Sequence, residues 1–412
     1  MIFIYNLFAH ITYFFLKISS YFNPKMKLFI TGRKETFSKL ASINTNDKVL
    51  WIHAASLGEF EQARPIIENL KILYANHKIV VTFFSPSGYE IRKNYPLADV
   101  VCYLPFDTRL NIKKFITTVQ PKLAILIKYE FWPNLLFELK KSRIPTILVS
   151  GIFRKKQHFF SILGFWTRSF LNTFQHFFVQ DENSKHLLNH INFYNTTVSG
   201  DTRFDRVLNI LEQNNTLDFI TTFKNNKYTT VAGSTWKEDE ELLVEYINTS
   251  ATAEEKFILA PHNINPSQIK KLKESITKKV VLYSEINDVS LSNYQVLIVD
   301  TIGLLTKIYA YADVAYVGGG LATGLHNILE PATFGIPIVF GDQKHQKFKE
   351  AVDLKTLNGA ESISNYEEMN RIFTSIREDQ KLRLMMGDTC QNYVAKNAGA
   401  TPLIIDYIKT IL

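Results

Sequence analysis

The sequence predicts an α/β protein of two parallel-sheet domains, preceded by an apolar helix. Short apolar runs with strand character alternate with helical stretches along the 412 residues, a polar stretch at 211–227 interrupts the alternation, and residues 1–22 are strongly apolar. Strands that alternate with helices are typical of a parallel sheet with helices on both faces. A chain of this length is also expected to form about two domains.

Residues 1–22 have the spacing of an amphipathic helix. Large apolar side chains recur at helical intervals from Ile4 to Phe22. A narrower polar stripe consists of Asn6, His10, Tyr13 and Lys17. Such a helix can lie in the plane of a membrane interface, which we favour, although about 20 residues would also span a bilayer and docking on the protein's own domain stays open. No small-residue cleavage site follows, so we do not expect a removed signal peptide.

The positive charge is concentrated near the N-terminus. The net charge is +8, and residues 1–45 hold six basic residues against one acid. The basic residues after Phe22 that we expect at an anionic membrane surface are Lys25, Lys27, Arg33 and Lys34. Basic flanks favour the cytoplasmic face. Nucleic acid is not expected as a partner, because no reader motif appears. Cys102 and Cys390 match no metal or redox spacing and fit a reducing compartment.

The strand pattern sets the expected domains. The first series of strands is 49–54, 78–84, 100–104, 123–127, 144–149, 177–180 and 196–199. The second series is 229–232, 256–260, 279–283, 296–299, 313–317 and 336–340, followed by a mostly helical tail. We therefore expect a membrane-associated helix at 1–22, Rossmann-like domains at 23–212 and 213–395, and a C-terminal helix at 396–412. Two such domains facing across a cleft form the GT-B architecture of glycosyltransferases.

Residues 315–341 contain a candidate nucleotide site. The apolar run at 314–317 ends in three glycines, and His326 and Asn327 follow before a helix expected to begin around Asn327. Glycines let backbone N–H groups approach a phosphate, and a helix N-terminus adds partial positive charge. Glu330 could accept hydrogen bonds from a ribose. A packing turn is the alternative, but it has no need of an imidazole, an amide and a carboxylate together.

The strand ends of the first domain carry candidate catalytic groups. Glu59 follows the strand at 49–54 and would lie at a helix start, where the dipole favours its anion. There it could accept a proton from an attacking hydroxyl, although it could also be only a favourable first-turn acid. Glu130 follows the strand at 123–127 and could instead form a surface ion pair with Lys128.

Two further loops follow strands at Arg203 and at Ser234–Thr235, the second of which reads as a plain helix cap. The sequence has no DxD motif and no metal-ligand spacing, so we expect no metal and no cofactor. Neutralising a departing phosphate would then fall to Arg203, helix N-termini and backbone N–H groups.

Taken in order, these motifs resemble the Kdo transferase family, where Kdo is 3-deoxy-D-manno-octulosonic acid. The resemblance covers residues 51 to about 399 and rests on SLGE at 56–59, KYEFWPN at 128–134, GDTRFD at 200–205, GST at 233–235, and GGG and HNILEP between 318 and 331. It implies an inverting, metal-independent GT-B enzyme of lipopolysaccharide biosynthesis. Such an enzyme moves Kdo from CMP-Kdo onto a lipid A precursor, lipid IVA, at the cytoplasmic face of the cell inner membrane.

The resemblance also implies roles for individual residues. Glu59 would be the general base, and Glu130 and Arg203 would stabilise the transition state. The implied nucleotide contacts are Pro261, His262, Ile302, Gly303, Leu304, Gly319, Gly320, Asn327, Ile328, Leu329 and Glu330.

The chain departs from the family pattern at several of these positions. It has His262 where the family usually has an arginine, Leu304 where a glutamate is usual, and Arg203 in place of a lysine, and a GIFRKKQ loop replaces the usual one. Two other functions stay open, namely a sugar-nucleotide epimerase of GT-B architecture and a non-catalytic membrane adaptor.

Overall fold

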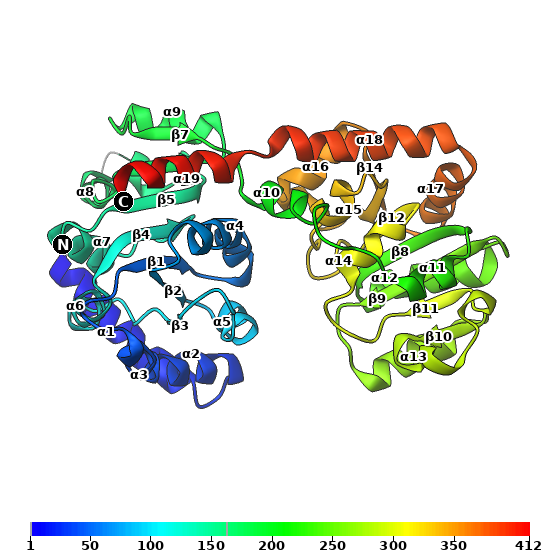
Figure 1. The fold of residues 1–412 in the computed structure, drawn as a ribbon, viewed down its shortest axis with the longest axis horizontal. Helices are drawn as coiled ribbons and strands as arrows, with labels where there is room; N and C mark the ends of the chain where they lie inside the picture. Colours follow the sequence, from blue (N-terminus) through cyan, green and yellow to red (C-terminus); the bar gives the residue numbers. More distant parts are fainter. Residues whose placement is uncertain (1, 162–163) are drawn as a thin grey trace. The chain divides into compact units, whose positions relative to one another are not determined.

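The computed structural model describes residues 2–161 and 164–412, which form two compact units (Figure 1). The first unit comprises Met1–Arg206 and Ala398–Leu412, and the second comprises Val207–Asn397. The division thus falls a few residues before the expected boundary at 212/213. The expected C-terminal helix is present, and it belongs to the first unit.

The first unit is built on a seven-stranded parallel sheet in the order β3-β2-β1-β4-β5-β6-β7. Its strands are β1 Val49–Ala54, β2 Lys78–Phe83, β3 Val100–Tyr103, β4 Pro121–Ile127, β5 Thr146–Gly151, β6 His176–Val179 and β7 Thr196–Val198. Each corresponds to a predicted strand. The strand order reverses between β1 and β4, and in open parallel sheets ligands bind beyond the carboxyl ends at such a reversal.

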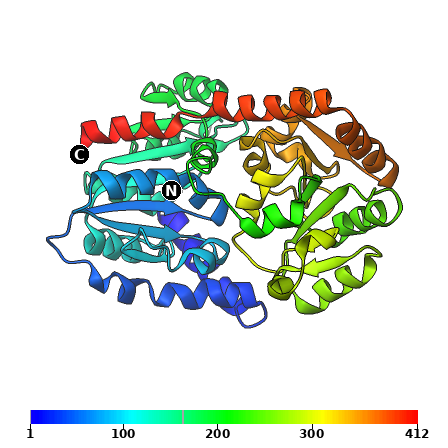
Figure 2. The same cartoon turned by 45° about the vertical axis from the view of Figure 1, so that its right-hand side comes forward.

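Helices cover both faces of this sheet. They are α1 Ile2–Ser19, α2 Pro24–Lys34, α3 Thr36–Lys39, α4 Leu57–Leu73, α5 Pro86–Arg92, α6 Arg109–Val119, α7 Pro133–Lys141, α8 Phe165–Leu171, α9 Glu182–His190, α10 Arg203–Leu208, which crosses the unit boundary, and α19 Ala400–Ile411. Alternate residues of β1 face opposite cores: Trp51 packs with Phe115 of α6, and Ile52 packs in the core that contains α4 and α19. Figures 1 and 2 both show α19 alongside this first unit.

The second unit repeats the plan with the order β10-β11-β9-β8-β12-β13-β14. Its strands are β8 Tyr228–Thr235, β9 Glu255–Pro261, β10 Val280–Leu282, β11 Val296–Ile298, β12 Val314–Val317, β13 Ile338–Gly341 and β14 Ala360–Ile363. Its α-helices are α11 Asp218–Lys224, α12 Lys237–Thr249, α13 Pro266–Ser275, α14 Leu305–Ile308, α15 Leu329–Thr333, α16 Lys349–Thr356, α17 Tyr366–Glu378 and α18 Gln380–Asn397. The expected connection at 211–227 is not only a linker, because α11 buries Ile220 and Phe223 in the core of this unit.

Helix α1 docks on the first unit through Tyr5 and two residues of the predicted polar stripe, Asn6 and Tyr13, while the other two, His10 and Lys17, are exposed. The Tyr5 hydroxyl donates to Asp107 Oδ2 at 2.7 Å, and Asn134 Nδ2 donates to Asn6 Oδ1 at 3.0 Å. The Tyr13 ring lies 5.1 Å from that of Phe106. The opposite side is exposed and apolar, with large side chains that include Phe3, Ile4, Leu7, Phe8, Ile11, Phe14, Phe15 and Ile18. Helix α1 is long and apolar enough to cross a membrane, and only 6% of it is buried.

Arg33 does not belong to the basic surface we expected. It is buried, and its guanidinium donates to the carbonyl oxygens of Phe29 and Phe84 and lies 3.6 Å from the centroid of the Phe29 ring. Burial lowers the pKa of Arg33 to about 9. Lys25, Lys27 and Lys34 are exposed and remain available to an anionic surface.

Candidate functional site

Glu59 lies in the first turn of α4, directly beyond β1, as predicted. Its Oε2 accepts from the backbone N–H of Ser56 at 3.0 Å, so the side chain also caps its own helix. We expected the helix start to favour the anion. Instead burial and the negative charge of Glu130 raise the pKa of Glu59, against the opposing effects of Lys128, His53 and the Ser56 N–H. A raised pKa suits a carboxylate that must take up a proton near neutral pH.

Glu130 lies beyond β4 and is buried, with 6% of its surface exposed. It is therefore not part of a surface ion pair. Its Oε2 accepts from Trp132 Nε1 at 2.6 Å and lies 2.9 Å from His53 Nε2. Because β1 and β4 are neighbours in the sheet, Glu59 and Glu130 occur at the same edge of the first unit.

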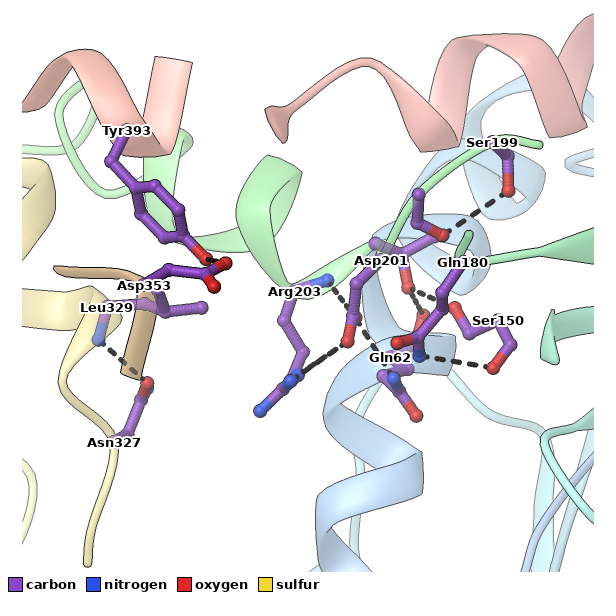
Figure 3. A network of polar contacts seen from close by, with 12 residues as sticks. Gln62, Ser150, Gln180, Ser199, Asp201, Arg203, Asn327, Leu329, Asp353 and Tyr393 are labelled. Carbon is purple, nitrogen blue, oxygen red and sulfur yellow. Dashed lines mark hydrogen bonds and ion pairs between the residues drawn. The ribbon is translucent and has the colours of Figure 1, made fainter. Parts of the chain in front are cut away.

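Arg203 lies at the start of α10, beyond β7, and is held by Asp201. Its Nε donates to Asp201 Oδ2 at 2.9 Å, and its backbone N–H donates to Oδ1 at 2.9 Å (Figure 3). Gln62 of α4 donates to the same carboxylate. Burial would raise the pKa of Asp201, but the charge and hydrogen bonds of Arg203 outweigh it and lower that pKa. The buried anion fixes the position of a half-exposed cation.

In the second unit, three rings gather beyond β8, β9 and β12. The His262 ring stacks on Trp236 and on His326, with centroids 4.7 and 4.5 Å apart. Trp236 Nε1 donates to His326 Nε2 at 2.9 Å. Burial and the neighbouring His262 lower the pKa of His326 to about 4, and burial lowers that of His262. Both imidazoles are therefore neutral at neutral pH, and this stack brings the loop with Pro261 and His262 against the segment that precedes Asn327.

A second polar group connects the remaining predicted nucleotide residues. Asn327 Nδ2 donates to Glu330 Oε1 at 3.0 Å, and the Thr306 hydroxyl donates to Glu330 Oε2 at 2.8 Å. Thr306 belongs to α14, which follows the turn at 302–304, where Ile302 and Gly303 are exposed and Leu304 is partly buried against the core. These contacts bring α14, which follows the predicted turn at 302–304, against the predicted residues Asn327 and Glu330. The side chains of Ile328 and Leu329 are buried, so only their backbones can contact a ligand.

The glycine segment differs in part from the prediction. The Gly319 N–H is donated to Asp239 Oδ2 at 2.8 Å. A Cβ on Gly320 would lie 2.3 Å from the Gly341 oxygen, and one on Gly318 would lie 2.4 Å from the Ser234 oxygen. Gly318 and Gly320 are therefore required for packing between neighbouring strand ends. The helix begins at Leu329, two residues after Asn327, whose side chain accepts from the Leu329 N–H, and it has five residues.

Sequence reasoning missed the parts of the site that depend on long-range contacts. Asp239 lies in the first turn of α12 and accepts from the Trp236 N–H, as a capping residue does, yet it also accepts from the Tyr316 hydroxyl at 2.7 Å. Burial raises its pKa against these hydrogen bonds. Nothing in the local sequence marked Thr306 or Trp236 as site residues, because Thr306 is a single polar residue in a short helix and Trp236 lies in the turn that caps α12. A cavity of about 630 Å³ opens beside Trp236 between α12 and α13, and of the predicted nucleotide residues only Pro261 lines it.

Within residues 2–161 and 164–412, no group of three or more His, Cys, Asp and Glu side chains could hold a metal ion. Metal independence therefore stays a prediction.

Residues 31–206 match the family model described as 3-deoxy-D-manno-octulosonic-acid transferase (kdotransferase). A 3-deoxy-D-manno-octulosonic acid transferase of Haemophilus influenzae is 26% identical over 378 residues, which covers 88% of this chain and 87% of the relative. The transferase of the same name from Aquifex aeolicus is 26% identical over 82% of this chain and 90% of the relative. The chain resembles the Kdo transferases. This confirms the resemblance inferred from the motifs and supports a glycosyltransferase.

Solved structures confirm the fold. A UDP-GlcNAc 2-epimerase from Neisseria meningitidis has a TM-score of 0.61 at 15% identity, covering 88% of this chain and 100% of that chain. MurG from Acinetobacter baumannii has a TM-score of 0.55 at 12% identity, covering 88% and 99%. At these identities the likeness shows the GT-B fold and nothing about the reaction.

Proposed function

We propose that this protein is an inverting glycosyltransferase that moves Kdo from CMP-Kdo to a lipid A precursor, lipid IVA, in lipopolysaccharide biosynthesis. The observation that carries the proposal is the placement of Glu59, Glu130 and Arg203 at the ends of β1, β4 and β7, within the region that matches the Kdo transferase family model. The similarity to Kdo transferases over most of the chain supports the donor.

Each residue has a distinct role in the proposed reaction. Glu59 takes the proton from the acceptor hydroxyl, and the oxygen of that hydroxyl forms a bond to the anomeric carbon of Kdo. The bond from that carbon to the CMP phosphate breaks, and CMP leaves with the electron pair. Glu130 supplies negative charge to the cationic sugar in the transition state, and Arg203 supplies positive charge to the phosphate. No metal takes part.

The proposal is tested by transfer in vitro. The purified protein, incubated with CMP-Kdo and lipid IVA, is expected to raise the lipid mass by whole Kdo units, as measured by mass spectrometry. The yield should be unchanged in excess EDTA, because Arg203 and backbone donors replace the metal. Complete loss in EDTA that is restored by magnesium would contradict metal independence, and no mass gain in either buffer would contradict the function.

The second unit is proposed to bind CMP through the group formed by Asn327, Glu330 and Thr306. Glu330→Ala and Asn327→Ala are each expected to weaken CMP binding by roughly 1–3 kcal/mol, since polar groups of the ribose lose a partner. Isothermal titration calorimetry measures this, with UDP as the competing nucleotide. Glu254→Ala is the matched control, because Glu254 is exposed and precedes β9 at the opposite edge of the sheet. Full CMP affinity in the Glu330 variant would place the donor elsewhere, and preference for UDP would favour an epimerase.

We further propose that α1 lies in the plane of the inner membrane, on its cytoplasmic face. The contacts of Tyr5 and Asn6 with Asp107 and Asn134 support this arrangement, because a helix that crosses a bilayer could not keep them. The exposed apolar side of α1 and the exposed Lys25, Lys27 and Lys34 would face anionic lipid.

A further inference from the structure

His53 is a buried imidazole at the end of β1 that the proposed reaction does not yet use. None of its surface is exposed, and its strand neighbours at the same level are Thr82 of β2 and Leu126 of β4. Its Nδ1 lies 2.8 Å from Thr82 Oγ1 and 3.0 Å from the Thr82 carbonyl oxygen. Its Nε2 lies 2.9 Å from Glu130 Oε2. The ring therefore bridges the middle of the sheet to the carboxylate at its edge.

The partners of His53 determine where its proton lies. An ionised Glu130 can only accept hydrogen bonds, so Nε2 must carry a hydrogen that it donates to Oε2. At the other end of the ring, Trp51 Nε1 donates to the Thr82 hydroxyl oxygen at 2.8 Å. The hydroxyl oxygen is thus an acceptor for Trp51, and its own hydrogen can be donated to Nδ1 of His53. Alternatively a protonated ring donates to the Thr82 carbonyl. In both forms His53 presents a donor to Glu130.

Trp132 holds Glu130 from a second side. Its Nε1 donates to Oε2 at 2.6 Å, and its ring stacks on Phe84 with centroids 4.9 Å apart. Two fixed donors therefore hold Oε2 of Glu130 and orient the plane of the carboxylate. The second oxygen, Oε1, is left as the acceptor that can face the substrate. Removing either donor would leave a buried anion with less stabilisation.

We propose that His53 is a positioning residue that holds Glu130 as an oriented anion beside Glu59. The charged groups at this corner include Glu59 on α4 and Lys128 and Glu130 after β4, while β2 contributes the neutral Thr82. The negative charge of Glu130 raises the pKa of Glu59 and the charge of His53 lowers it, so both groups act on the proposed base. The inference rests on the proposed transferase function, in which Glu130 works in its ionised form.

The first test compares two substitutions at position 53. His53→Leu fills the space without a donor, and we expect kcat to fall roughly 10²-fold because Glu130 is no longer oriented. The acid side of the pH–rate profile should move to higher pH, since the charge of His53 no longer lowers the pKa of Glu59. His53→Gln restores an N–H donor of similar reach and should recover most of kcat. His176→Leu is the matched control, since His176 bonds the Thr197 hydroxyl at 2.8 Å at the far end of the same sheet.

A second readout needs no substrate. The indole N–H resonance of Trp132, assigned by its loss in Trp132→Phe, reports its hydrogen bond to Glu130 in ¹⁵N-tryptophan-labelled protein. We expect this resonance to shift in His53→Leu and to keep its native position in His176→Leu.

The outcomes separate the inference from the function on which it rests. If the native chain transfers no sugar, the function fails, and the indole resonance still tests the placement of Glu130. If the native chain is active but His53→Leu matches His176→Leu in kcat, pH profile and indole resonance, His53 only fills the core and the inference is overturned.

Discussion

Glu59→Gln is expected to lower the rate of Kdo transfer by roughly 10²–10⁴-fold, because glutamine cannot take the proton from the acceptor hydroxyl. The fold should survive, since the glutamine oxygen can still accept from the Ser56 N–H that Glu59 caps at 3.0 Å. The rate is measured with CMP-Kdo and lipid acceptor, and CMP binding should be unchanged. Glu68→Gln on the same helix is the control, because Glu68 is partly exposed and forms an ion pair with Arg64 at 2.9 Å, away from the strand end.

The pKa of Glu59 also predicts how the transfer rate changes with pH. Glu59 acts as a base only when ionised, and burial and Glu130 raise its pKa above the ordinary value. Native activity should therefore decline, as pH falls, at a higher pH than an ordinary glutamate would require. That acid limb should be absent from the residual activity of Glu59→Gln. Near-native turnover in the variant would assign the base to another group.

The exposed phenyl rings of α1 are expected to dominate membrane binding. Replacing Phe3, Phe8 and Phe15 by serine should weaken vesicle binding on the order of 10³-fold, taking about 1.5 kcal/mol for each ring moved into lipid. These three side chains are 79%, 62% and 62% exposed, so their removal should not disturb the body of the protein. Co-sedimentation with anionic vesicles measures the effect, and it should be insensitive to salt.

A second set of variants tests the contribution of the basic residues to membrane binding. Replacing Lys25, Lys27 and Lys34 by glutamine should cost about 1 kcal/mol each and matter mainly at low salt. Arg33 is left in place because it is buried. Transfer to a detergent-solubilised acceptor should survive both sets of changes. If deleting residues 1–22 leaves sedimentation as complete as in the intact chain, α1 is a packing element and the membrane role is wrong.

The sheets could be predicted because their strands are buried runs of apolar residues, a signal contained in a few neighbouring positions. Strand β14 lacks this signal and was not predicted, because Glu361 and Ser362 interrupt its apolar pattern. The position of Glu59 was also readable, because strand ends and helix caps are local features. Its pKa was not, because it depends on burial and on Glu130, which lies 71 positions further along the chain.

The rest of the site is formed by pairs distant in sequence. His53 and Glu130 are 77 positions apart, and Trp236 and His326 are 90 apart. Asp239 reaches the Gly319 N–H across 80 positions, so a glycine pattern alone could not show that this donor is already used. Such partners are set by strand order, which the sequence pattern does not specify.

The last helix has a consequence for how the chain is made. Helix α19 buries Ile404, Ile405 and Ile408 among the residues of α4 and β1, and Asp205 accepts from the backbone N–H groups of Gly399 and Thr401 at its start. The core of the first unit is therefore incomplete until the final 15 residues have left the ribosome, after the whole second unit. Domains usually fold in the order of their synthesis. Here the first unit cannot complete its core before the second unit has been synthesised. In nascent chains that stop before α19, the apolar surface of α4 and β1 that α19 covers would stay exposed.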